Sequence, residues 1–139
     1  MNFQTLLKMG VVTGILMNAF DIIVQGLLLA GFYTAPVFRK PEDEIVYLVL
    51  TDFAAAFVFV WLYLKLGRAT TGRGVAGGAT FGFYAGVLYS FPMFYAMHLL
   101  FNGYTSELAW INTVYQVLVY VIIGAAAGAL NKARPVVPR

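Results

Sequence analysis

The chain has 139 residues and a net charge of +3; 61% of its residues are hydrophobic and only 11% are charged. A soluble domain carries about 25% charged residues to cover its surface, so this composition excludes an ordinary soluble protein and indicates a membrane protein. The chain has no cysteine, which excludes disulfides and thiolate metal sites.

Four apolar stretches are long enough to cross a bilayer, which takes about 20 residues per helix. They are residues 9–32, 45–64, 75–101 and 108–130. None alternates apolar and polar residues as a membrane β-strand does. The sequence therefore predicts an all-α fold: four transmembrane helices that form an up-down-up-down bundle because their connections are short. We expect residues 1–139 to be one integral membrane domain with a flexible tail at 134–139.

The first stretch carries two small residues and then three polar ones. In chain order these are Gly10, Gly14, Asn18, Asp21 and Gln25. The three polar residues are spaced so that they share one helix face. The length of the stretch and its polar interruptions predict a retained helix and not a signal peptide.

The second stretch contains Asp52, the only other acid inside a predicted helix. Asp21 lies thirteen residues from Lys8, and Asp52 lies thirteen from Lys65. A rise of about 1.5 Å per residue therefore predicts the same depth for both acids. Ionised acids are unfavourable in a bilayer, so we expect both to face the interior. Two interpretations stay open: a proton or cation site, or neutral groups that join helices by hydrogen bonds.

The third stretch contains small residues at every fourth position. They are Gly74, Gly78, Gly82, Gly86 and Ser90. Residues four apart lie nearly above one another on a helix, so they form a flat stripe that lets another helix approach closely. The fourth stretch has a shorter stripe, Gly124 and Gly128. With Gly10 and Gly14, these are the predicted packing residues; their partner is either a helix of this chain or a second copy.

Polar residues recur on one face of the fourth stretch, at Asn112, Gln116 and Tyr120. Together with the two acids they predict a polar belt in the middle and outer part of the bundle. Buried tyrosine hydroxyls need partners, and the belt offers them to the interior candidates. These candidates are Tyr84, Tyr89, Tyr95, Tyr115 and Tyr120.

His98 is the single histidine and a candidate haem ligand. A second haem ligand would have to be the histidine of another copy, or Met93 or Met97. A histidine near the membrane interface more often hydrogen-bonds a loop or a headgroup. We therefore expect no metal and no cofactor.

Most basic residues lie at one set of predicted helix ends. They are Lys8, Lys65, Arg68, Arg73, Lys132, Arg134 and Arg139, whereas Arg39 and Lys40 lie at the other. This bias predicts that both termini are cytoplasmic. Lipid headgroups, and not nucleic acid, are the expected partners of these charges.

Four features together suggest a resemblance to a known type of protein. They are the acid Asp21, the Gly-Phe-Tyr run at 31–33, the following loop of prolines and acids, and the third stretch with glycine at every fourth position. The chain resembles small bacterial inner-membrane proteins of four spans, a type with no established activity. In its first-helix acid it is also similar to four-span multidrug transporters, from which its length and its second acid, Asp52, distinguish it.

Three functions compete. The first is a non-enzymatic interaction protein, a homo-oligomer or an accessory subunit of a membrane complex that assembles through its glycine faces. The second is a small proton- or cation-coupled transporter or channel that uses Asp21 and Asp52 in an outward-facing polar and aromatic cavity. A lipid or small hydrophobic molecule is a candidate ligand. The third, a membrane enzyme or haem protein, depends on His98 and Ser90 alone, and no catalytic constellation is visible.

Overall fold

The computed structural model of the chain describes residues 2–32 and 45–131, and the predicted all-α fold is confirmed. The long helices are α1 (Phe3–Phe20), α2 (Ile45–Leu62), α4 (Gly74–Leu100) and α5 (Ser106–Leu130). Helical structure continues after α1 as a π-helix, Asp21–Leu28, and a 3-10 turn, Ala30–Phe32; after α2 it continues as a π-helix, Tyr63–Gly67, and the short α3, Arg68–Thr70. Three parts of the sequence analysis lie outside the described residues: the predicted tail at 134–139, the loop with Arg39 and Lys40, and Lys132.

Two helical regions extend beyond one end of their predicted stretches. α1 begins at Phe3, six residues before the predicted start, because the Asn2 side chain accepts a hydrogen bond from the Gln4 N–H at 3.0 Å and caps the helix. The second helical region runs on to Thr70. Gly67 lies within it because a Cβ there would meet the ring of Phe81 at 2.7 Å, so this glycine permits close packing and does not end the helix.

Within residues 2–32 and 45–131, three helical regions are long and apolar enough to cross a membrane: Phe3–Leu28, Val46–Thr70 and Ser106–Leu130. They indicate an integral membrane protein. The fourth predicted span is helical, as α4, but it is not among these three. Its glycines, tyrosines, Ser90, Pro92 and His98 make it less apolar than the others.

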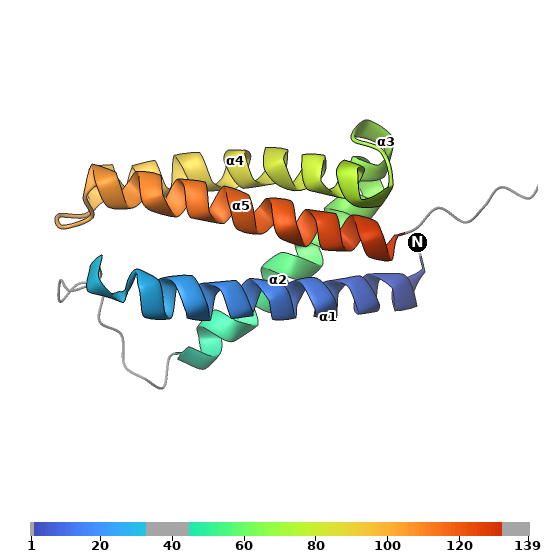
Figure 1. The fold of residues 1–139 in the computed structure, drawn as a ribbon, viewed down its shortest axis with the longest axis horizontal. Coiled ribbons are helices and arrows are strands. Elements are labelled where there is room, and N and C mark those ends of the chain that lie inside the picture. The colour runs from blue at the N-terminus through green and yellow to red at the C-terminus, as the bar shows by residue number, and fades with distance from the viewer. Residues whose placement is uncertain (1, 33–44, 132–139) are drawn as a thin grey trace, which may run out of the picture.

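The helices form two antiparallel pairs, α1 with α2 and α4 with α5 (Figure 1). α4 and α5 lie side by side along their whole length, while α2 runs obliquely behind α1 toward the start of α4. One buried apolar cluster joins α1, α2, the following π-helix and α5. Its members are Met9, Met17, Ala56, Phe59, Val60, Tyr63, Val119, Tyr120, Ile123 and Ala127. This cluster fixes the two pairs against each other.

Candidate functional site

The glycine stripe of α4 faces α5 of the same chain. A Cβ at Gly78 would collide with the carbonyl oxygen of Gly124, and one at Gly82 would collide with that of Tyr120. One at Gly86 would lie 3.0 Å from the Cβ of Tyr120. These contacts are with backbone or Cβ atoms, which cannot move aside as the end of a long side chain can. The stripe therefore allows two helix backbones to touch.

The contact is reciprocal. A Cβ at Gly128 would collide with the carbonyl oxygen of Gly74, and one at Gly124 with that of Gly78. Gly74 itself has open space where a Cβ would stand; its φ of +80° instead favours glycine at the start of α4.

The glycines of α1 work differently. The ring of Phe57 lies over Gly10, and the ring of Phe53 lies over Gly14, where a Cβ would collide with them. Gly10 and Gly14 therefore receive aromatic side chains of α2, and not a helix backbone. The Asn18 amide extends the same face: it donates to the Gly14 carbonyl at 3.0 Å and reaches that of Val49, on α2, at 3.5 Å.

The two acids predicted at equal depth come together. Asp21 is the first residue of the π-helix after α1, and Asp52 lies on α2. Their side chains lie close enough to interact directly. Because a carboxylate only accepts hydrogen bonds, the two groups can hydrogen-bond to each other when one of them holds a proton. We call Asp21 and Asp52 the carboxyl pair.

A third helix contributes to the carboxyl pair. The Tyr115 hydroxyl, on α5, donates to Asp21 Oδ1 at 2.6 Å. Tyr120, one turn further along α5, is buried and lies within electrostatic range of both carboxyl groups. Gln25 is half-buried one turn beyond Asp21. The pair thus lies where α1, α2 and α5 meet.

The predicted polar belt is divided between two places. Asn112 and Gln116 are buried, and the Asn112 amide donates to the Tyr104 hydroxyl at 2.9 Å, at the turn between α4 and α5. Tyr84, Tyr89 and Tyr95, predicted to be interior, are exposed side chains of α4. The prediction of interior tyrosines was wrong there, because the face of α4 toward α5 is made of small residues.

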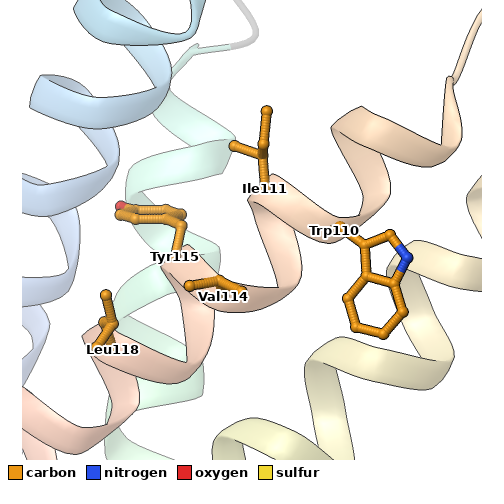
Figure 2. A pocket seen from close by; sticks show the side chains of 5 residues that line it. All are labelled: Trp110, Ile111, Val114, Tyr115 and Leu118. Atoms are coloured by element: carbon orange, nitrogen blue, oxygen red, sulfur yellow. The ribbon is translucent and has the colours of Figure 1, made fainter.

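An open groove of about 480 Å³ lies along α5 beside the carboxyl pair. Figure 2 shows the five side chains that line it: Trp110, Ile111, Val114, Tyr115 and Leu118. Only Tyr115 connects it to the carboxyl pair, since its ring lines the groove while its hydroxyl points toward α1 and Asp21. The groove is aromatic and apolar.

His98 stabilises the turn between α4 and α5. Its Nδ1 lies 2.8 Å from the carbonyl oxygen of Tyr104, so that nitrogen carries a proton and donates. Within the described residues no three histidine, aspartate or glutamate side chains gather as metal ligands would.

Comparison of the chain with protein-family models, with curated proteins and with solved structures finds no match. The resemblance to small four-span proteins therefore stays a prediction.

Replacing Tyr115 with phenylalanine tests the third member of the site. Hydrogen bonds to charged or strongly polar partners contribute about 1.5–3 kcal/mol, so we expect Tyr115→Phe to lower the free energy of unfolding in mixed micelles by about that amount. Tyr84→Phe is the matched control, because its ring is 62% exposed. Equal stability of the two variants would show that the Tyr115 hydroxyl adds nothing.

Proposed function

We propose that the chain is a small proton- or cation-coupled transporter of a bacterial inner membrane, in which the carboxyl pair binds the coupling ion. The observation that carries this proposal is the close approach of Asp21 and Asp52, two acids on different helices of an apolar bundle, with the Tyr115 hydroxyl bonded to Asp21. Intramembrane acids are rare because they are unfavourable there, and they commonly mark ion pathways. A pair that holds one proton can exchange it for a cation.

The proposal includes four spans with both termini cytoplasmic. α4 has 27 residues and lies along α5, so it crosses the bilayer wherever α5 does. Lys8, Lys65, Arg68 and Arg73 belong to the end of the bundle where α1 and α4 begin, and Glu107 lies at the opposite end. This charge distribution supports the orientation through the positive-inside tendency.

The competing proposal, an oligomer or accessory subunit assembled through glycine faces, has lost its principal support. The glycines at 10, 14, 78, 82, 86, 124 and 128 all have close neighbours within the chain. Packing within the chain therefore accounts for these glycines without a partner, which favours the transporter over an assembly through glycine faces.

Infrared spectroscopy in detergent or lipid tests the proposed site, since a protonated carboxyl has a C=O stretching band that a carboxylate lacks. We expect this band in the wild type at neutral pH, together with proton release when Na⁺ or another cation binds. Asp21→Asn and Asp52→Asn should each remove the band. Glu107→Gln is the control, because Glu107 is exposed in the first turn of α5.

A wild-type spectrum with no protonated carboxyl band at neutral pH would contradict the proposal. So would proton release that persists when both aspartates are replaced by asparagine.

A further inference from the structure

Two buried polar atoms, one on α4 and one on α5, have no hydrogen-bond partner among the described residues. They are the Ser90 hydroxyl oxygen and the Gln116 amide oxygen, on side chains with exposed fractions of 0% and 6%. Buried polar groups are nearly always hydrogen-bonded, either to protein or to ordered water. We therefore expect each of these atoms to have a hydrogen-bond partner.

The helix register places these atoms near each other. Gly86 contacts α5 at Val117 and Tyr120, and Phe94, two turns further along α4, packs on the cluster that contains Leu108. Ser90 lies halfway between Gly86 and Phe94, so it faces the turns of α5 between those two contacts. Those turns contain Asn112 and Gln116.

The side-chain directions bring them closer still. A helical side chain leans toward the N-terminus of its own helix, so the Gln116 amide leans toward the level of Asn112, which is that of Ser90. A hydroxyl that donates and an amide oxygen that accepts are complementary to one water molecule, which can receive one hydrogen bond and give the other.

We propose that Ser90 and Gln116 hold a buried water molecule, and that this water is part of a polar route to the carboxyl pair. On one side of Gln116, Tyr120 lies within electrostatic range of both acids. On the other side, Asn112 is hydrogen-bonded to the Tyr104 hydroxyl, at the turn between α4 and α5. The proposed water lies in the gap between Tyr120 and Asn112. The water site does not depend on the proposed function, whereas the route rests on it.

Nuclear magnetic resonance of the protein in micelles tests the water site. We expect cross-relaxation between long-lived water and the backbone amide protons of Gly86 and Ser90 in the wild type. Gln116→Leu should abolish it, and the milder Ser90→Ala should weaken it. Thr113→Val is the control at the same depth, because the Thr113 hydroxyl already donates to the Ala109 carbonyl at 2.8 Å. Absence of the signal in the wild type, or its persistence in Gln116→Leu, would overturn the water site.

The rate of deuterium exchange at the carboxyl band tests the route. After transfer to heavy water, the band should shift several-fold more slowly in Gln116→Leu than in the wild type or in Thr113→Val. Equal rates would show that protons reach the pair another way, and the route would be wrong. If the wild type has no carboxyl band at all, the proposed function and the route both fail, whereas the micelle experiment still decides whether the water is bound.

Discussion

Gly82→Ala is expected to force α4 away from α5 and to lower the free energy of unfolding by about 1–3 kcal/mol or more, the usual effect of overpacking a filled interior. The added methyl group would collide with the carbonyl oxygen of Tyr120. That atom belongs to a helix backbone, so relief requires a shift of the whole helix. Gly82→Leu should abolish the helix pair altogether.

The control is Gly26→Ala in the π-helix that follows α1. No atom lies within 4 Å of the Cβ it would add, and alanine favours helix over glycine by about 1 kcal/mol. The same chemical change should therefore be neutral or stabilising there. Unfolding in mixed micelles measures both variants.

A Gly82→Ala protein as stable as the wild type would mean that the two helices are not in backbone contact. A fall in stability that depended on protein concentration would instead assign the stripe to an interface between copies. The two arrangements are thus separable with the same variant.

The packing stripes were visible in the sequence, but their partners were not. A four-residue step appears on both α4 and α5, and each stripe read alone predicts close approach to some helix. Which helix it approaches depends on contacts between distant parts of the chain. The aromatic partners of Gly10 and Gly14 were hidden for the same reason, because Phe53 and Phe57 are two of many large apolar residues on α2.

For the carboxyl pair too, the sequence predicted what depends on nearby residues but not what depends on distant ones. Equal spacing from Lys8 and Lys65 predicted equal depth, since helical rise is constant. The contribution of Tyr115 could not be singled out among five candidate tyrosines, because it lies 94 residues from Asp21. The π-helix that begins at Asp21 had no sequence signal either. Such segments are rare and often occur at functional sites.

Rising pH is expected to destabilise the wild type, while the Asp21→Asn, Asp52→Asn double variant should respond much less. The hydrogen bond between the two carboxyl groups depends on one proton. Once that proton leaves, two negative charges face each other in an apolar bundle, where each ionised acid costs about 2.5–3.5 kcal/mol at the membrane centre. In the unfolded chain the two acids are apart and hold no shared proton. The native state therefore binds more protons, and linkage makes its stability fall as pH rises.

The measurement is the free energy of unfolding in mixed micelles from mildly acidic to mildly alkaline pH. Paired asparagines keep the size of the side chains and can still hydrogen-bond to each other, but they do not titrate. The difference between wild type and double variant therefore isolates the shared proton, with Glu107→Gln correcting for an exposed acid. If wild type and double variant follow parallel curves, no proton is held between the helices and the coupling site has no physical basis. A wild-type curve that falls by about 3 kcal/mol relative to the double variant would give the pair enough energy to couple proton binding to movement of α1 against α2.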